Sequence, residues 1–309
     1  MEAAIEIEGL TKTFGHGPDA IASVDHLSLR VDKGEIFGFL GPNGAGKTTT
    51  VKMLAGIIFP TSGAARLLGK PLGDVATRAR IGFMPETVRL STFMRAEDWL
   101  GFHARLYGMD AGRSRARVKE VMARTGLAGR AGSRVRDFSQ GMMQRIILAQ
   151  AIINEPDLLF LDEPASALDP LGRRDLREII TGLRDRGTTI FLNSHLLSEV
   201  ELVCGRVGIL NHGKLIRVDK LGDITGPVQV VDVKAEGISS ETAAAIRRLA
   251  AKVEFGLDGR FTATLDSEEQ LGKLAEIITR GGGALKEFSP RRISLEDAFL
   301  EEIGEDGSS

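Results

Sequence analysis

The chain has 309 residues, of which 42% are hydrophobic and 27% are charged, and its formal net charge is -2. This composition is typical of a globular protein with one large domain or two smaller ones. The near-neutral charge gives no overall electrostatic sign of a nucleic-acid partner, and we expect none. Cys204 is the only cysteine, which excludes an intrachain disulfide and favours a reducing compartment.

No apolar run approaches the roughly 18 residues that are needed to span a bilayer. The start of the chain, Met1 to Glu6, lacks the basic and apolar regions of a signal peptide. We therefore expect a cytoplasmic protein, and any association with a membrane would come through a partner.

Alternation of apolar and polar residues predicts half-buried strands at 3–9 and 21–32. Between them, Phe14 stands beside Gly15 in a polar segment. A lone Phe usually belongs to a core, but a ring in this setting would be free to stack on a nucleotide base. Phe14 is therefore a candidate base-stacking residue.

The loop from Gly41 to Thr48 matches the pattern G-x-x-x-x-G-K-[ST] at every fixed position. An apolar strand at 36–40 leads into it, and apolar residues at helical spacing over 51–58 predict a helix after it. Glycines let the backbone N–H groups turn inward around an anion, and the helix dipole adds positive potential. The alternative is a glycine-rich turn with a chance Lys-Thr pair. The predicted nucleotide-binding residues are Gly41, Pro42, Asn43, Gly44, Ala45, Gly46, Lys47, Thr48 and Thr49.

Two side chains of this loop have specific chemistry in such a pattern. Lys47 can reach the β- and γ-phosphates of a nucleotide, and the Thr48 hydroxyl can ligate Mg²⁺.

The middle of the chain alternates between strand and helix patterns. This alternation predicts a mostly parallel sheet, with ligands at the carboxyl ends of its strands. Short strands are expected at 64–68 and 81–84, amphipathic helices over 92–125, a helix at 140–153 after the N-cap Ser139, a buried strand at 158–161, a basic helix at 171–186, a buried strand at 188–192 and a helix at 196–203.

The strand at 158–161 delivers two acids, Asp162 and Glu163, to its carboxyl end. Asp162 can hold Mg²⁺, and Glu163 can accept a proton from an attacking water. An acidic helix cap is the alternative interpretation, but the Lys47 loop upstream favours catalysis. His195 follows the next strand, where it could donate to a γ-phosphate oxygen.

Near Gly226 the character of the chain changes. Strand and helix patterns follow in the order β-α-β-β-α-β, the split βαβ arrangement. We therefore expect a small C-terminal α+β domain of ferredoxin-like order at 227–309, after a first domain at 1–225. The last residues, 304–309, are expected to be disordered.

The order and spacing of these motifs resemble the ATP-binding-cassette (ABC) family over roughly residues 4–225. The details are similar to ABC-2-type exporters, whose ATPase subunit is separate from the membrane permease, and Ser294–Leu300 looks like the tail of that group. The family signature usually reads Leu-Ser-Gly-Gly-Gln, and in Phe138–Met142 only Ser139 and Gly141 match it strictly. The sequence there resembles a Ser-x-Gly-Met variant of this exporter group.

The resemblance implies an α/β P-loop NTPase fold with a mostly parallel sheet core, an antiparallel β-subdomain and a helical subdomain at about 88–155. It also implies a Mg²⁺-dependent ATPase in which two copies form a homodimer and sandwich two ATP molecules head to tail. Ser139, Gln140 and Gly141 of one copy would then face the γ-phosphate held by the other copy. Asp169 would contact the opposite subunit. The dimer would drive a separate integral-membrane permease on the cytoplasmic face of the membrane, with Lys47, Glu163 and His195 as catalytic residues.

One departure from the family pattern is Glu86, which stands where the family has glutamine. A carboxylate there can still ligate Mg²⁺ and keep a coupling role, although a solvated loop acid is the alternative.

Two other function classes remain open. One is a soluble ABC-type ATPase that acts on ribosomes or DNA, and the other is a nucleotide-dependent switch in which 227–309 binds a small ligand. The single cassette, without sustained heptads or a basic linker, favours the exporter subunit over the first alternative.

Overall fold

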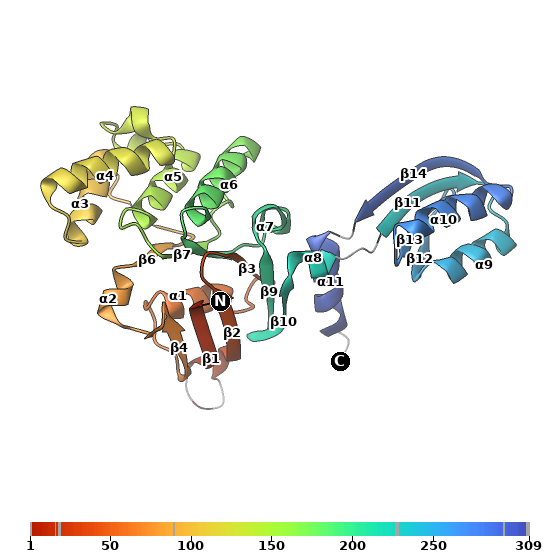
Figure 1. Ribbon diagram of the computed structural model, residues 1–309, viewed down its shortest axis with the longest axis horizontal. Helices are drawn as coiled ribbons and strands as arrows, with labels where there is room; N and C mark the ends of the chain where they lie inside the picture. Colours follow the sequence, from red (N-terminus) through yellow and green to blue (C-terminus); the bar gives the residue numbers. More distant parts are fainter. Residues whose placement is uncertain are drawn as a thin grey trace. The chain divides into compact units, whose positions relative to one another are not determined.

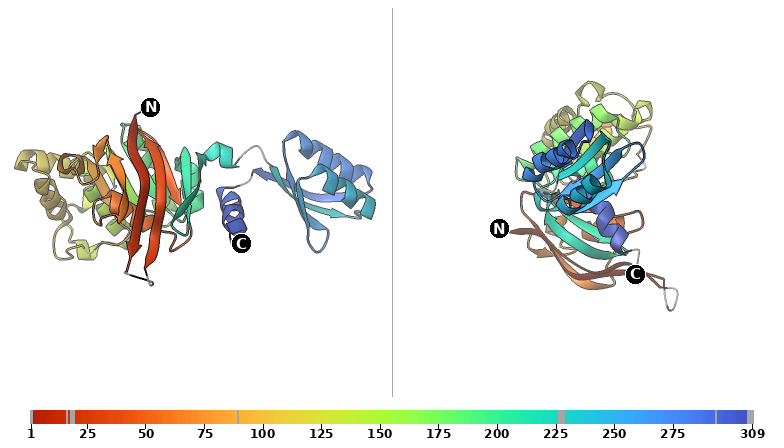
Figure 2. Two further views of the ribbon diagram at one scale, coloured as in Figure 1. Left: turned by 90° about the horizontal axis from the view of Figure 1, so that it is seen from below. Right: turned by 90° about the vertical axis from the view of Figure 1, so that its right-hand side faces the viewer.

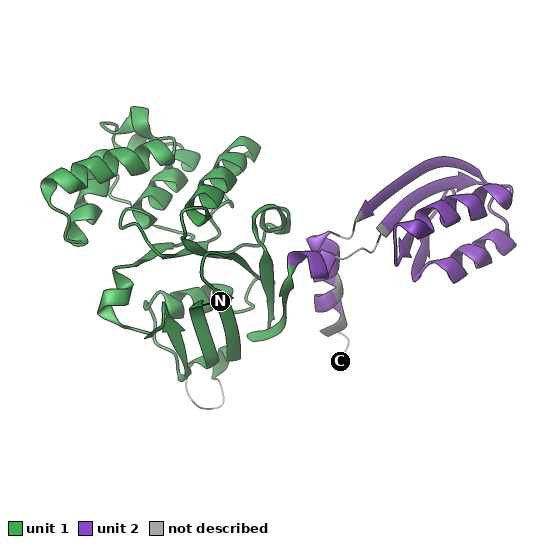
Figure 3. Ribbon diagram, viewed as in Figure 1, with its two compact units in different colours: residues 1–220 green, residues 221–309 purple. Residues whose placement is uncertain are grey.

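The computed structural model describes residues 2–15, 17, 20–88, 90–225, 229–292 and 294–306. It divides into two compact units, residues 1–220 and 221–309 (Figure 3). The short helix α8 (Leu221–Thr225), which the sequence placed in the first domain, therefore belongs to the second unit.

The first unit is built around a six-stranded sheet whose members, except one edge strand, run parallel (Figure 1). Its order is β10 (Lys214–Lys220), β9 (Arg206–Asn211), β3 (Ile36–Leu40), β8 (Thr189–Asn193), β7 (Leu158–Asp162) and β6 (Ile81–Met84), and β10 pairs antiparallel with β9. Strands β3, β7 and β8 are buried along their whole length. The Phe191 ring lies 5.1–5.7 Å from the rings of Phe37, Phe39 and Phe160, so aromatic packing fixes the centre of the sheet.

A second, antiparallel sheet packs on this core. Its order is β2 (Ile21–Asp32), β1 (Ala3–Phe14), β4 (Ser62–Leu67) and β5 (Lys70–Pro71), and the long β1–β2 pair is clear in Figure 2. The predicted end of β1 at residue 9 is wrong because Leu10 is fully buried opposite Leu27, and the ladder continues to Phe14. Helix α1 (Lys47–Leu54) lies between the two sheets and ends earlier than predicted.

Three helices gather on one side of the first unit: α3 (Ala96–Leu106), α4 (Ala111–Arg124) and α5 (Gln140–Ala151) (Figure 1). We call them the helical subdomain. Helices α6 (Pro170–Arg184), α7 (Leu197–Val203) and the short α2 (Val75–Arg78) complete the unit. Leu106 and Tyr107, at the end of α3, are exposed. No described helix is both long enough and apolar enough to cross a bilayer.

The second unit has its own core. Its antiparallel sheet has the order β12 (Lys252–Phe255), β13 (Arg260–Leu265), β11 (Gln229–Glu236) and β14 (Ala284–Arg292). Helices α9 (Ser240–Leu249) and α10 (Glu269–Arg280) pack on it through residues such as Ile246 and Leu274. The last helix, α11 (Leu295–Asp306), overturns the expected disorder at 304–306, while 307–309 lie outside the described residues.

Candidate functional site

The loop between β3 and α1 is shaped by glycines. Gly44 and Gly46 have φ angles of 81° and 102°, in the left-handed region that favours glycine. A Cβ atom at Gly46 would lie 2.1 Å from the carbonyl oxygen of Ser23, so no larger residue fits there without movement of the backbone. The loop is thereby held in a curled path, and α1 starts directly after it.

Lys47 is folded back onto this loop. Its Nζ donates to the carbonyl oxygens of Gly41, at 2.8 Å, and Pro42, at 3.0 Å. Burial lowers the pKa of Lys47, and the nearby carboxylates of Glu163, Asp162 and Glu86 oppose that shift. The ammonium group is thus positioned by backbone oxygens and lies in the field of three acids.

Asp162 ends β7, and its carboxylate meets polar groups from two other elements. Asp162 and Asn193 are paired in the parallel register of β7 and β8, and the Asn193 amide donates to Asp162 Oδ1. The Thr48 hydroxyl donates to the same oxygen at 3.2 Å. Burial raises the pKa of Asp162, and these two hydrogen bonds oppose that shift. Asn193 Oδ1 is buried and has no hydrogen-bond partner among the described residues.

Glu163 turns away from the strand with a φ of 52°, in the left-handed region, and its N–H donates to the carbonyl oxygen of Asn193 at 2.9 Å. Its Oε2 lies 2.7 Å from His195 Nδ1 and 3.4 Å from the Ser194 hydroxyl, which donates to it. The Glu163 side chain is almost buried, whereas His195 is half-exposed. The two predicted catalytic residues are therefore in direct contact.

These groups surround one cavity of about 310 Å³. It brings together the loop after β3, the loop after β6 and the carboxyl ends of β7 and β8, as expected for a sheet of this class. Its lining residues are Ser23, Asn43, Gly44, Ala45, Gly46, Lys47, Thr48, Thr49, Glu86, Glu163, Asn193 and His195.

Two of these lining residues were missed from the sequence. Ser23 comes from β2, and its hydroxyl donates to Thr49 Oγ1 at 3.0 Å. Asn193 ends the strand next to the one that ends in Asp162, and that position was the signal that could have identified it.

Gly41, Pro42 and Asp162 contact lining residues but do not line the cavity themselves. The other predicted residues lie elsewhere in the unit, and within the described chain they do not line this cavity. Phe14 ends β1 and is 47% exposed, and the ammonium group of Lys12 lies 5.1 Å from its ring centroid. Ser139 caps α5, where its Oγ accepts from the Met142 N–H at 3.3 Å, and Gln140 and Gly141 form the first turn. Asp169 caps α6 and accepts from the Gly172 N–H at 2.7 Å.

Comparison with known proteins identifies the family. The family model described as "ABC transporter" matches residues 24–166. An uncharacterised ABC transporter ATP-binding protein of Nostoc sp. is 40% identical over 94% of this chain and 85% of its own length. The chain belongs to the ABC transporter ATP-binding proteins. As a member of that family it is an ABC-type ATPase.

Two further relatives have names that concern export or resistance. The Nod factor export ATP-binding protein I of Paraburkholderia xenovorans is 41% identical over 70% of both chains. The linearmycin resistance ATP-binding protein of Bacillus subtilis is 34% identical over 80% of this chain and 79% of its own.

Solved structures agree with the cassette fold. A structure described as the ATP-binding subunit of an ABC transporter has a TM-score of 0.64 and 30% identity, over 72% of this ABC ATPase and 91% of that chain. A dimeric cassette solved with ADP and phosphate has a TM-score of 0.65 at 23% identity, over 70% of this chain and 98% of its own, and shows likeness of fold.

Proposed function

We propose that this ABC ATPase powers a membrane exporter through ATP-driven, head-to-tail dimerisation of its cassettes. The observation that carries the proposal is the division of the predicted site within one chain. Lys47, Glu163 and His195 line the cavity, whereas Ser139 and Gly141 stand at the start of α5, outside its lining in the described chain. A second copy, turned head to tail, would supply the start of its own α5 to this cavity.

Both halves of the proposed site, the cavity of one copy and the start of α5 of the other, have chemistry that suits a bound triphosphate. Lys47 and the N–H groups of the loop would hold the phosphates, and the N-terminus of the partner's α5 would face the γ-phosphate. Glu163 would accept the proton of the attacking water while His195 orients its carboxylate. Asp169 would lie at the dimer interface, and the exposed ring of Phe14 would stack on the base.

The residues beside the cavity also fit Mg²⁺. The donors are oxygens, as this ion prefers: the Thr48 hydroxyl and the Asp162 carboxylate, with the Glu86 carboxylate on the cavity lining. The unpartnered Oδ1 of Asn193 adds a further acceptor. When bound, the ion would neutralise charge on the β- and γ-phosphates.

The exporter role is inferred from relatives whose names concern Nod factor export and linearmycin resistance. By that analogy the partner is a separate integral-membrane permease, and the ATPase works at the cytoplasmic face of the membrane. Residues 1–220 would be the cassette, and the second unit, 221–309, would contain an accessory domain of ferredoxin-like order.

The dimer is tested with Glu163→Gln, which removes the base and keeps the shape of the side chain. We expect loss of ATP turnover by about a hundredfold or more. We also expect a doubled mass in size-exclusion chromatography with Mg-ATP, because ATP is bound but not cleaved. Glu8→Gln, on an exposed position of β1, is the control and should stay monomeric at the same ATP concentration. A Glu163→Gln protein that stays monomeric would refute the sandwich.

The exporter role is tested by affinity purification of the tagged chain from detergent-solubilised membranes of its native host. We expect a hydrophobic, multi-spanning protein to co-purify and to stimulate ATP turnover. Recovery of ribosomes or DNA, or of the ATPase alone from every fraction, would point to the other function classes.

A further inference from the structure

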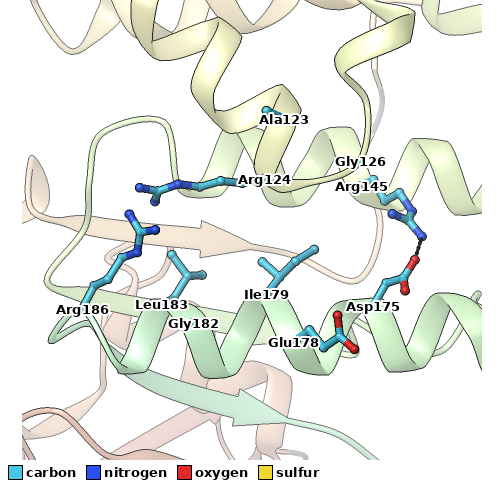
Figure 4. Close-up of a pocket in the computed structure, with 10 residues that line it drawn as sticks. All are labelled: Ala123, Arg124, Gly126, Arg145, Asp175, Glu178, Ile179, Gly182, Leu183 and Arg186. Atoms are coloured by element: carbon cyan, nitrogen blue, oxygen red, sulfur yellow. Dashed lines mark hydrogen bonds and ion pairs between the residues drawn. The ribbon is translucent and has the colours of Figure 1, made fainter.

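A second cleft, of about 370 Å³, lies between the helical subdomain and α6, on residues that the nucleotide cavity does not use (Figure 4). The end of α4, the turn after it, α5 and one face of α6 form its walls. The lining residues are Ala123, Arg124, Gly126, Arg145, Asp175, Glu178, Ile179, Gly182, Leu183 and Arg186.

One end of this cleft is cationic. Arg124 extends from α4 and Arg186 from the turn after α6, and the two guanidinium groups point toward each other (Figure 4). Arg124 is ion-paired with Glu120. Arg186 has no ion pair or side-chain hydrogen bond in the part of the chain that the structure describes. Burial lowers the pKa of Arg124, the Glu120 carboxylate opposes that shift, and the positive charge of Arg186 acts in the same direction as burial. The charge of Arg186 also acts on Glu120 and helps to lower the pKa of that carboxyl group.

The opposite end is closed by an ion pair. Arg145 on α5 lies 2.6 Å from the Asp175 carboxylate on α6, and it also donates to the carbonyl oxygen of Thr125 at 3.2 Å. Between the two ends, the side chains of Ile179 and Leu183 point from α6 into the cleft (Figure 4). The cleft therefore combines an apolar floor with two cationic groups that face each other, and Glu120 beside them carries one negative charge against their two positive charges.

We propose that this cleft binds a small organic anion whose phosphoryl or carboxylate group sits between Arg124 and Arg186. Its apolar part would rest on Ile179 and Leu183. Planar guanidinium groups bind both kinds of anion through paired N–H donors. The cleft volume of about 370 Å³ falls within the range of roughly 300–1,000 Å³ that is typical of small-molecule sites. Because Arg124 belongs to the helical subdomain and Arg186 follows α6, the bound anion ties these two parts of the cassette together.

The test is isothermal titration calorimetry on the full chain without nucleotide, metal or chelator. A parallel titration of Lys47→Ala identifies any heat that comes from the nucleotide cavity. Pyrophosphate and succinate are titrated separately, so that the phosphoryl and carboxylate chemistries are distinguished. We expect at least one probe to bind the wild type. Arg186→Gln should weaken that binding about tenfold or more, since hydrogen bonds to charged groups are the strong ones.

The matched control is Arg184→Gln, which removes the same charge at the same helix end but lies outside the cleft lining. It should bind the probe as the wild type does. If neither probe binds the wild type, or if both variants lose binding equally, the proposal is wrong.

A second variant reverses the charge at this position. Arg186→Glu would place a carboxylate opposite Arg124 and near Glu120. We expect it to abolish probe binding, and binding that persists at the wild-type level would show that Arg186 takes no part in the site.

Discussion

At the scale of single residues, Lys47 and Asp162 are opposite charges that burial disfavours for the same reason. The pKa of Lys47 is lowered and that of Asp162 is raised, because a low-dielectric setting favours the neutral form of each. In the proposed function each would gain from a ligand of opposite sign, phosphate oxygens for Lys47 and a divalent cation for Asp162. In the free protein the burial of these two charges is unfavourable, and the proposed ligands would offset that unfavourable free energy.

The first prediction concerns Asp162→Asn, which should stabilise the protein in the absence of nucleotide and metal by about 1 kcal/mol near neutral pH. The folded-state pKa of Asp162 is raised above its ordinary value of 3.8, so the protonated carboxyl is stabilising below that value. This contribution is lost as pH rises through the folded-state pKa. The advantage of the variant should therefore grow with pH in that window, as measured by thermal unfolding from about pH 4 to about pH 8. A constant difference would contradict the argument.

The second prediction is that Lys47→Ala lowers ATP turnover by about a hundredfold or more, because an electrostatic contact to the phosphates is lost. The matched control is Lys52→Ala, on the exposed side of the same helix. A phosphate-release assay measures both. Undiminished turnover in Lys47→Ala would end the assignment of this loop to the nucleotide.

At the scale of elements, the strands that carry the site could be predicted because they are short, fully apolar and bounded by turn residues. Strands β3 and β7 lie where the sequence placed them, with β7 extended by one residue to Asp162. The end of β1 could not be predicted, since the pairing of Leu10 with Leu27 depends on a strand that follows later in the chain. Tertiary pairing, and not local propensity, decided that boundary.

The site was predictable only in part, for a related reason. The phosphate-binding loop is a local motif, and its glycines and Lys47 can be recognised from the sequence. Asn193 contacts Asp162 only because β7 and β8 are paired in this register. A local sequence pattern does not predict which strands pair. Ser23 reaches the loop from the other sheet. Likewise, the Gln144 amide of α5 donates to the Pro164 carbonyl at 3.0 Å, a link to the loop after β7 that sequence alone does not show.

The third prediction compares two Gly→Ala changes that are expected to shift the free energy of unfolding in opposite directions. Gly46→Ala should lower the free energy of unfolding by about 1–3 kcal/mol and abolish ATP binding, because its Cβ meets the Ser23 carbonyl and its φ is positive. Gly272→Ala, on the exposed side of α10 with no atom near its Cβ, should raise the free energy of unfolding by about 0.5–1 kcal/mol. Chemical denaturation measures both. Equal effects would mean that the loop relaxes around the new methyl group.

The fourth prediction concerns the loop after β6. Glu86 is exposed and lines the nucleotide cavity. Glu86→Ala should impair the ATP turnover that the membrane partner stimulates more than it impairs ATP binding. Turnover in reconstituted vesicles and nucleotide binding in solution separate the two effects, with Glu8→Ala as the control. If Glu86→Ala keeps the partner-stimulated turnover of the wild type, Glu86 is a solvated loop acid without a coupling role.

At the scale of the whole molecule, the two units have separate hydrophobic cores, and every lining residue of the nucleotide cavity comes from the first. The fifth prediction is that the fragment 1–220 folds and hydrolyses ATP within about threefold of the full chain, as expected of a domain with its own core. Circular dichroism measures the folding of the fragment, and a phosphate-release assay measures its ATP turnover. A fragment that fails to fold would show that 221–309 is a structural part of the cassette.

The left-handed backbone of Glu163 has a practical consequence for engineering. A non-glycine residue in that region stores roughly 1 kcal/mol of conformational energy, which glycine would release. A library screened only for heat resistance would therefore accumulate glycine at this position. With Glu163 as the proposed base, those proteins would be stable but inactive, so a thermostabilisation campaign has to keep residue 163 unchanged.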